Sequence, residues 1–355
     1  MTKTRVLVVE DSATVRARLV EILSADPGIE LVGEACDGKH AIELCLQHRP
    51  DLITMDMMLP VMTGVAATEY IMAHCPTPIL VVSASTNRGE LFKIYDALAA
   101  GAVDVLEKPN GDEPAGDWER RFLATVKLVA RIRVITHPRA RLAELRARPS
   151  DPPFAAAAAA QACAVVAIGA STGGPGAIAE VLRGLPPQFQ IPVLVVLHIN
   201  EPFGTAFADW LDGQTARRAT YAEDGAPVAS LTGRVAVARG GCHLTVREGR
   251  LRLTDGPERH SCRPSVDVLF ESIAADYGAS AAACLLTGMG RDGALGLLKV
   301  REAGGTTIAQ DESTSVVYGM PREAVVLGAA QQILRIGEIG PRLAALEGIA
   351  MERCQ

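Results

Sequence analysis

The chain of 355 residues has few aromatic side chains, no paired cysteine motif and no excess of positive charge. Phe, Trp and Tyr make up only 4% of the residues, too few for a protein that recognises RNA or single-stranded DNA by stacking bases on aromatic rings. Lys and Arg total 35 against 41 Asp and Glu, which gives a net charge of −6, whereas a general nucleic-acid binder is usually basic. We therefore expect no nucleic-acid partner.

The eight cysteines are scattered, and no two of them have a C-x-x-C or other zinc-ligand spacing. We expect reduced, mostly buried thiols. The first residues run straight into a strand-like segment without the apolar core of a signal peptide. The longest apolar run, Ala155–Ala170, contains Gln161 and is too short to span a bilayer. These absences predict a cytoplasmic protein with no segment inserted in a membrane.

Two stretches of alternating strand-like and helix-like segments make up most of the chain. Hydrophobic residues account for 48% of the sequence, and the length is sufficient for two domains with large cores. The first stretch covers residues 1–125. Its expected strands are Val6–Glu10, Leu31–Cys36, Leu52–Met57, Ile79–Ala84 and Val103–Lys108. Apolar strands that alternate with helical segments such as Ala13–Leu23 predict a parallel sheet covered on both faces.

A segment of different composition, residues 126–161, separates this stretch from a second one at 162–345. It is rich in arginine and proline and ends near the run Ala155–Ala160, which predicts a linker that permits relative motion of two domains. The expected strands of the second stretch are Cys163–Gly169, Val193–His198, Val235–Ala238, His243–Val246, Ala283–Leu286 and Thr306–Ala309. A hairpin turn is expected at Arg247–Arg250.

In the first stretch, polar residues suited to a metal ion and a phosphoryl group follow successive strands. Glu10 and Asp11 end the first strand, Asp56 the third, Ser83 the fourth and Lys108 the fifth. The carboxyl ends of parallel strands meet at one edge of the sheet, where three carboxylates repel one another unless a cation joins them. Oxygen ligands of this kind suit Mg²⁺. A phosphoryl group on Asp56 would then be held by the metal, a hydroxyl and an ammonium group.

With these residues, the first stretch resembles the receiver domain of two-component response regulators. The resemblance is carried by Val8–Ser12, Asp51–Pro60, Val82–Ala84 and Glu107–Pro109. It implies a flavodoxin-like (βα)5 fold, with Asp56 phosphorylated by a chemotaxis histidine kinase. It also implies Mg²⁺ bound by Glu10 or Asp11, by Asp56 and by the Met58 carbonyl, with Ser83 and Lys108 as the switch residues.

The second stretch opens with a strand that runs into Gly169-Ala170-Ser171-Thr172-Gly173. The G-x-S-x-G pattern places a serine on a tight strand-to-helix turn, where small neighbours expose its hydroxyl and the following amides can face an oxyanion. The glycines could instead cradle a phosphate or a dinucleotide, but their order does not match G-x-G-x-x-G, and the next strand ends in His198 rather than an acid. Ser171 is therefore the candidate nucleophile.

A histidine and an aspartate reach the same edge of the second predicted sheet. His198 ends the second strand of this stretch, and Asp292 lies in a glycine-rich turn after the strand Cys284–Leu286. Each alone is commonly a capping or turn residue, but together they complete a Ser–His–Asp triad in which the carboxylate orients the imidazole. The order Ser…His…Asp disfavours the α/β-hydrolases, whose order is Ser…Asp…His. Asp267 and Asp311 are the alternative orienting carboxylates.

Residues 162–345 resemble the catalytic domain of the chemotaxis-receptor methylesterases, the protein-glutamate methylesterase (CheB) family. The resemblance is carried by Ile168–Gly174, Val195–His198, Arg263–Phe270, Leu286–Gly293, Ala309–Glu312 and Val317–Ala324. The chain departs from the family pattern at Ile199–Gly204, Cys242–His243 and Ser261–Arg263. We expect these three loops to border the substrate groove.

The resemblance implies a doubly wound, mostly parallel α/β catalytic domain. It implies Ser171 as nucleophile, His198 as general base and then acid, and Asp292 as the orienting residue. Thr172 is implied beside the imidazole and the Met289 amide in the oxyanion hole. The ester chemistry itself is expected to need no cofactor.

Together the two resemblances imply a phosphorylation-activated serine esterase. It would hydrolyse glutamate methyl esters on methyl-accepting chemotaxis receptors, release methanol and also deamidate receptor glutamines. The same chemistry could serve a chemotaxis-like pathway that does not govern flagella. A phosphorylation-dependent scaffold without turnover is disfavoured by the complete triad, and a DNA-binding regulator by the acidic chain without a recognisable helix-turn-helix. We also expect the unphosphorylated receiver to cover the catalytic edge and phosphorylation to weaken that contact.

Overall fold

The computed structural model describes residues 3–84, 87–109, 114, 116–132, 134, 163–199 and 203–351. The chain divides into two compact units, Met1–Arg146 and Ala147–Gln355, and each is described by itself. Most of the predicted linker 126–161 lies outside the described residues, so its role stays a prediction. No helix within the described part of the chain is both long and apolar enough to cross a membrane.

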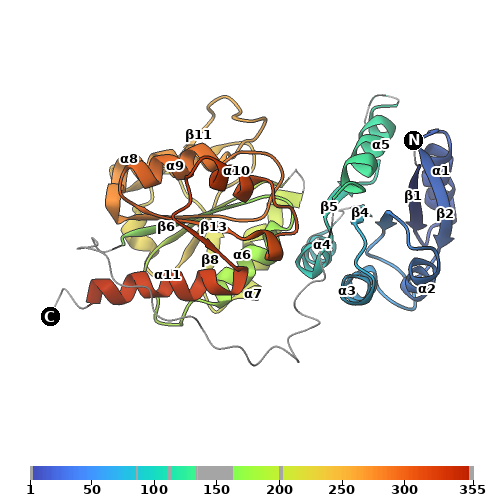
Figure 1. The fold of residues 1–355 in the computed structure, drawn as a ribbon, viewed down its shortest axis with the longest axis horizontal. Coiled ribbons are helices and arrows are strands. Elements are labelled where there is room, and N and C mark those ends of the chain that lie inside the picture. The colour runs from blue at the N-terminus through green and yellow to red at the C-terminus, as the bar shows by residue number, and fades with distance from the viewer. Residues whose placement is uncertain are drawn as a thin grey trace. The chain divides into compact units, whose positions relative to one another are not determined.

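The N-terminal unit is a five-stranded parallel sheet between two groups of helices (Figure 1). Its strands are β1 (Thr4–Val9), β2 (Ile29–Ala35), β3 (Leu52–Met55), β4 (Ile79–Ser83) and β5 (Asp104–Glu107). Its helices are α1 (Ala13–Ser24), α2 (Gly38–His48), α3 (Gly64–His74), α4 (Arg88–Ala100) and α5 (Asp117–Val129). The strand order is β2-β1-β3-β4-β5; α1 packs against α5, while α2, α3 and α4 pack in succession. The predicted flavodoxin-like arrangement is confirmed.

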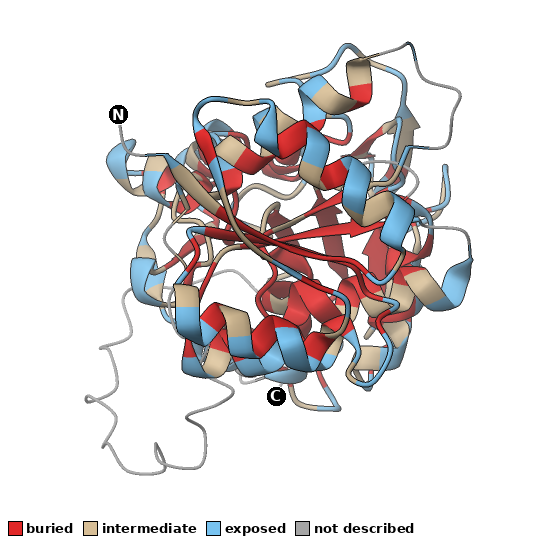
Figure 2. Ribbon diagram, turned by 90° about the vertical axis from the view of Figure 1, so that its right-hand side faces the viewer, coloured by how far each residue is buried: buried red, intermediate tan, exposed pale blue. Residues whose placement is uncertain are grey.

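The first four helices begin where a side chain caps their free amide groups. Ser12, Asp37, Thr63 and Asn87 are the N-cap residues, and each accepts a hydrogen bond from the amide three residues further on. The inner strands β1, β3 and β4 are apolar and largely buried, and the buried residues are drawn red in Figure 2. Capping and burial together fix where each strand ends and its helix begins.

The last helix of this unit, α5, continues four residues beyond position 125 and ends at Val129. It does so because Val126 and Val129 are buried, on the same side as Trp118 and Phe122. The first residues of the segment 126–161 therefore belong to the helical core of the N-terminal unit.

The C-terminal unit contains a seven-stranded sheet in which neighbouring strands are all parallel, together with a separate antiparallel hairpin. In spatial order the sheet strands are β14 (Gln332–Leu334), β13 (Thr306–Gln310), β12 (Ala281–Leu285), β6 (Val165–Ala170), β7 (Val193–Leu197), β9 (Val235–Val237) and β8 (Ala219–Tyr221). The hairpin joins β10 (His243–Arg247) to β11 (Arg250–Thr254). The α-helices are α6 (Gly174–Arg183), α7 (Phe207–Gln214), α8 (Val266–Tyr277), α9 (Ala294–Glu302), α10 (Met320–Val326) and α11 (Ile336–Met351).

The two outermost strands, β8 and β14, are absent from the strands that the sequence predicts. Each is only three residues long and partly exposed, so neither carries enough apolar residues for its pattern to be visible. The predicted hairpin turn is present. Glu248 and Gly249 at its centre both have positive φ, 53° and 68°, as a two-residue hairpin turn of the type I′ class requires.

The first strand of the C-terminal sheet, β6, lies between β7 and β12. The chain moves from β6 to β7 on one side and later returns to β12 on the other, which makes β6 a topological switch point. In open α/β sheets, ligands bind outside the carboxyl ends of the strands at such a point. The fold therefore indicates the edge beyond Ala170, Leu197 and Leu285 as the place to look for a site.

Candidate active site

Ser171 occupies the turn between β6 and α6. Its amide donates to the Thr287 carbonyl at 3.0 Å, and its carbonyl accepts from the Gly174 amide at 2.7 Å, so the backbone is held on both sides. Gly173 has φ of 77°, a conformation that favours glycine. A Cβ on Gly288 would lie 2.8 Å from the Ser171 Cβ, so only glycine permits this approach. The tight strand-to-helix turn predicted from G-x-S-x-G is present.

His198 lies beside Ser171 at the end of the neighbouring strand. Ala170 is in register with Leu197, and the His198 amide donates to the Ala170 carbonyl at 3.0 Å. The His198 side chain is 13% exposed. Among the described residues, no hydrogen bond joins the Ser171 hydroxyl to the imidazole. Catalytic hydrogen bonds of this kind are often formed only when substrate is bound.

Asp292 is the carboxylate that contacts His198. Its Oδ2 lies 2.9 Å from the imidazole Nε2. The same carboxylate accepts from the Ser265 hydroxyl at 2.8 Å and from the amides of Val266 at 2.7 Å and Asp267 at 3.2 Å. Asp292 is only 2% exposed, so this set of donors replaces solvent around it.

The two alternative carboxylates have other partners. Asp267 accepts from the Gly296 amide at 2.6 Å and lies 3.1 Å from His260 Nε2. Asp311 caps the segment that follows β13, where its carboxylate accepts from the Thr314 amide at 3.2 Å. Neither is paired with His198 among the described contacts. Asp292 is thus the carboxylate that the fold brings to the imidazole.

The pair has opposite pKa shifts. Burial opposes protonation of His198, but the hydrogen bonds with Asp292 and Cys262 outweigh it and raise the pKa of His198 to about 9. Burial favours the neutral form of Asp292, but the hydrogen bonds from His198, Ser265 and Val266 lower the pKa of that carboxyl below its ordinary value. Asp292 is therefore ionised and can only accept hydrogen bonds, so Nε2 of the neutral imidazole carries the proton. The free lone pair is on Nδ1.

Cys262 faces that remaining nitrogen, with its Sγ 3.7 Å from His198 Nδ1. Sequence reasoning placed Cys262 only in a loop that departs from the family pattern. It also missed Ser265, whose hydroxyl donates a hydrogen bond to the Asp292 carboxylate. Both precede the helix α8 in the motif Cys262-Arg263-Pro264-Ser265, and the N-cap position of Ser265 is the signal that could have indicated its role.

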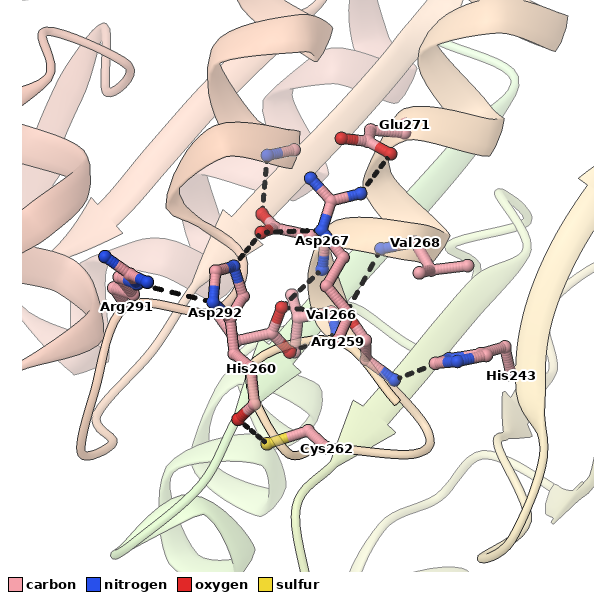
Figure 3. A network of polar contacts seen from close by, with 12 residues as sticks. His243, Arg259, His260, Cys262, Val266, Asp267, Val268, Glu271, Arg291 and Asp292 are labelled. Carbon is pink, nitrogen blue, oxygen red and sulfur yellow. Dashed lines mark hydrogen bonds and ion pairs between the residues drawn. The ribbon is translucent and has the colours of Figure 1, made fainter. Parts of the chain in front are cut away.

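A two-residue turn presents Cys262 to the site (Figure 3). The amides of Arg259 and Cys262 each donate to the other's carbonyl, at 3.1 and 2.9 Å. Between them, His260 and Ser261 have φ of 52° and 59°. The turn is anchored because His260 lies 3.1 Å from the buried Asp267 and accepts from Arg291 Nε at 3.3 Å.

The residues expected around an oxyanion lie in the loop after β12. The amide of Met289 forms no hydrogen bond within the described residues, whereas the amide of Gly288 donates to Val317 at 3.0 Å. Met289 is exposed, and its amide is the candidate donor to an oxyanion. The Thr172 carbonyl accepts from the Thr287 hydroxyl at 2.9 Å, but no described hydrogen bond joins the Thr172 hydroxyl to His198.

In the N-terminal unit, the predicted acidic residues lie at the carboxyl ends of β1 and β3. Glu10, Asp11 and Asp56 have carboxylate oxygens within 4.8 Å of one another. Lys108 Nζ lies 2.8 Å from Glu10 Oε2 and 3.0 Å from Asp56 Oδ2. Burial raises the pKa of Glu10, although Lys108 partly offsets this. Burial opposes the charge of Lys108, but its contacts with Glu10 and Asp56 raise the pKa of that ammonium group.

These residues fit a divalent cation. Glu10 Oε2 is buried and accepts no hydrogen bond within the described residues. The cluster contains three carboxylates and the ammonium group of Lys108, so its negative charges outnumber its positive charge. Ser83 is buried at the end of β4, next to the strand that ends before Asp56. Met58 lies two residues beyond Asp56 and is exposed. Oxygen donors around a net negative charge suit Mg²⁺.

The comparisons with known proteins agree with this geometry. Residues 166–343 match the family model described as CheB methylesterase, and residues 6–114 match the response regulator receiver domain. The chain is 44% identical over 335 residues, 94% of each chain, to protein-glutamate methylesterase/protein-glutamine glutaminase 2 of Anaeromyxobacter dehalogenans. This chain belongs to the CheB methylesterase family.

A second relative and a solved structure are similar to this chain over most and about half of its length, respectively. Protein-glutamate methylesterase/protein-glutamine glutaminase 3 of Hahella chejuensis is 41% identical over 96% of this chain and 97% of its own. The crystal structure of the Thermotoga maritima CheB methylesterase catalytic domain is 36% identical, with a TM-score of 0.49, and covers 52% of this chain and 98% of that one. The family resemblance drawn from the sequence is confirmed in both halves of the chain.

The contact with Asp292 predicts an unusually basic His198. In the full chain, NMR titration of histidine ring signals should give His198 a pKa of about 9. Asp292→Asn removes the negative partner and should lower that pKa by about one to three pH units. Asp267→Asn is the matched control, because Asp267 contacts His260 instead. An Asp292→Asn protein whose His198 still titrates near pH 9 would contradict the assignment of the pair.

Proposed function

We propose that this chain is a phosphorylation-activated protein-glutamate methylesterase that also acts as a protein-glutamine glutaminase. The observation that carries the proposal is the Asp292–His198 pair at the switch point of a CheB methylesterase domain, with Ser171 on the adjacent strand. Its substrates are glutamate methyl esters on methyl-accepting chemotaxis receptors, and its phosphodonor is a chemotaxis histidine kinase. Its relatives carry the names of both activities.

In the acylation step, the Ser171 hydroxyl attacks the ester carbonyl and His198 takes its proton. Asp292 holds Nε2, so in this proposal the base is Nδ1, which takes the proton of Ser171 on the adjacent strand. The imidazolium that forms is stabilised by the ionised, buried carboxylate. Collapse of the tetrahedral intermediate breaks the ester C–O bond, and the imidazolium returns the proton to the leaving methanol.

The negative oxygen of the intermediate requires donors that are already in place. The unpaired Met289 amide supplies one, at the end of a loop fixed by the Thr287 hydroxyl between the Thr172 carbonyl and the Val317 amide. Removing one such donor typically costs a factor of about 10²–10³ in turnover. In this proposal, the hydrogen bond from the Thr287 hydroxyl to the Thr172 carbonyl also holds Thr172 beside the imidazole.

Deacylation repeats these reaction steps with water in place of the Ser171 hydroxyl as the attacking group. His198 Nδ1 takes a proton from water, the hydroxide attacks the acyl carbonyl, and Ser171 leaves with the returned proton. The products are a receptor glutamate and regenerated enzyme. A receptor glutamine enters by the same route, with ammonia as the leaving group, and its amide bond is the harder one to break.

The receiver unit supplies the control. Asp56 accepts a phosphoryl group, and the Lys108 ammonium, already 3.0 Å from the carboxylate, offsets the added charge. Bound Mg²⁺ would neutralise further phosphoryl charge, held by Glu10 or Asp11, by Asp56 and by the Met58 carbonyl. Ser83 then turns its hydroxyl toward the phosphoryl oxygens. In this proposal, phosphorylation of Asp56 activates the esterase.

Loss of the nucleophile should abolish turnover. Ser171→Ala is expected to lower methanol release from methyl-labelled receptors by a factor on the order of 10⁴–10⁶, because no other hydroxyl replaces it. Asp292→Asn should be less damaging but still severe. Ser230→Ala, an exposed serine away from the site, is the control and should keep full activity. Near-normal methanol release by folded Ser171→Ala would rule out this triad.

The reaction should also depend on pH through His198. Only the neutral imidazole can take the Ser171 proton, and its pKa is raised to about 9. The value of kcat/KM for receptor demethylation should therefore rise with pH and level off near pH 9. A profile that is already flat from pH 7 upward would contradict a base with this pKa.

Phosphorylation should depend on Asp56. Asp56→Asn should abolish Mg²⁺-dependent labelling of the full chain by acetyl phosphate, and with it any stimulation of methanol release by that phosphodonor. The matched control is Asp51→Asn, an exposed carboxylate at the opposite end of β3. Acid-stable, hydroxylamine-resistant label on Asp56→Asn would argue against an aspartyl phosphate at this position.

A further inference from the structure

The thiol of Cys262 has no part in the reaction derived above, yet it faces the atom on which the reaction depends. Its Sγ lies 3.7 Å from His198 Nδ1, the nitrogen that must take the Ser171 proton. Nε2 is not available to any other partner, because Asp292 holds it at 2.9 Å. The thiol of Cys262 and the free nitrogen of the His198 imidazole are thus direct neighbours at the carboxyl edge of the sheet.

This separation fits two ligands of one tetrahedral metal ion. Typical Zn–N and Zn–S distances are about 2.0–2.1 and 2.3 Å, and with the ligand atoms 3.7 Å apart they give an N–Zn–S angle of about 115°. The tetrahedral angle is about 109°. A metal ion can therefore bridge Cys262 Sγ and His198 Nδ1 with almost no movement of either side chain.

The surroundings of His198 are those of a metal-binding histidine. Such a histidine generally donates its second ring N–H to a carboxylate, which fixes its tautomer and directs the other nitrogen at the metal. Asp292 does this here, and three further donors hold the carboxylate in place. His198, Cys262 and Asp292 all lie close enough to form a metal-binding group. We assign the first two as ligands and Asp292 as the outer carboxylate.

Cys262 is held in position rather than carried on a flexible loop. It closes the turn that starts at Arg259, and the two residues between them adopt left-handed backbone conformations that cost free energy in non-glycine residues. His260 ties that turn to the buried Asp267 and to Arg291. Figure 3 shows the anchored turn with the Cys262 sulfur at its end. A ligand that is fixed before binding loses little entropy when the ion arrives.

We propose that Cys262 Sγ and His198 Nδ1 form a binding site for a thiophilic divalent ion such as Zn²⁺, and that the bound ion inhibits the enzyme by occupying its general base. The thiol proton is released to solvent on binding, and no electron is transferred. Thiolate and imidazole favour Zn²⁺ over Mg²⁺ or Ca²⁺, which prefer oxygen ligands. The half-buried Cys262 leaves access from solvent, and water completes the coordination. The inhibition rests on the proposed esterase function, whereas the binding does not.

Direct binding is tested on the full chain with Co²⁺ as a spectroscopic substitute for Zn²⁺. Excess Mg²⁺ is present, so that the acidic cluster of the receiver unit is saturated. A thiolate-to-cobalt absorption band should appear in the wild-type protein and in Ser171→Ala. In Cys262→Ser, Cys262→Ala and His198→Gln, this absorption band should be absent, or its intensity should be lower by that of one equivalent of bound metal. Cys242→Ser, which removes another partly buried cysteine of the same unit, should retain it.

Inhibition is tested by demethylation assays at increasing Zn²⁺. Each variant is normalised to its own metal-free rate. Cys262→Ser should raise the Zn²⁺ concentration for half-inhibition by at least about tenfold, and Cys242→Ser should leave it unchanged.

If a cobalt band with the intensity of one equivalent of metal survives in both Cys262→Ser and Cys262→Ala, the metal site is overturned, whatever the esterase activity of these variants. If the band depends on Cys262 but no variant or wild-type protein releases methanol, the esterase function fails and the metal site stands. Equal Zn²⁺ sensitivity of wild type and Cys262→Ser overturns the inhibitory role.

Discussion

The contact between Asp292 and His198 organises the C-terminal unit. A buried carboxylate is costly unless hydrogen bonds replace its solvation. Here Ser265 and the first amides of α8 supply them, so the positive end of that helix stabilises the negative charge. The charge in turn fixes the tautomer of His198. The ionised Asp292 carboxylate therefore joins three segments: the loop after β12, the start of α8 and the end of β7. A shift of any of these segments would move the imidazole or its partner.

The ends of neighbouring strands provide the rest of the site. Ser171 and His198 are adjacent because β6 and β7 pair in register, and glycine at position 288 allows the loop after β12 to approach the serine backbone. The receiver unit uses the same principle with different chemistry. Its acidic residues and Lys108 collect beyond the carboxyl ends of a parallel sheet. Two separate parallel sheets thus carry the candidate hydrolytic site and the candidate phosphorylation site at equivalent edges.

Much of this could be predicted because it depends on local patterns. Buried parallel strands are continuous apolar runs, and Ser171, His198 and Asp292 each follow one. The short edge strands β8 and β14 could not be predicted, since their few residues carry no clear pattern. The environment of Cys262 was equally inaccessible, because it depends on a turn whose two central residues have positive φ although neither is glycine. The hydroxyl of Ser265 was missed because it reaches its partner only when α8 meets the loop after β12.

The strand order of the C-terminal sheet has a consequence for synthesis of the protein. The central strand β6 pairs with β7, its successor in the chain, but its other neighbour β12 is made about a hundred residues later. Ser171 and His198 can therefore come together early on the ribosome, while the carboxylate that contacts the imidazole arrives only with the loop beyond β12. An unfinished chain can hold the serine and the histidine side by side without the carboxylate that orients the imidazole, so this arrangement of three residues is completed only when the sheet is nearly complete.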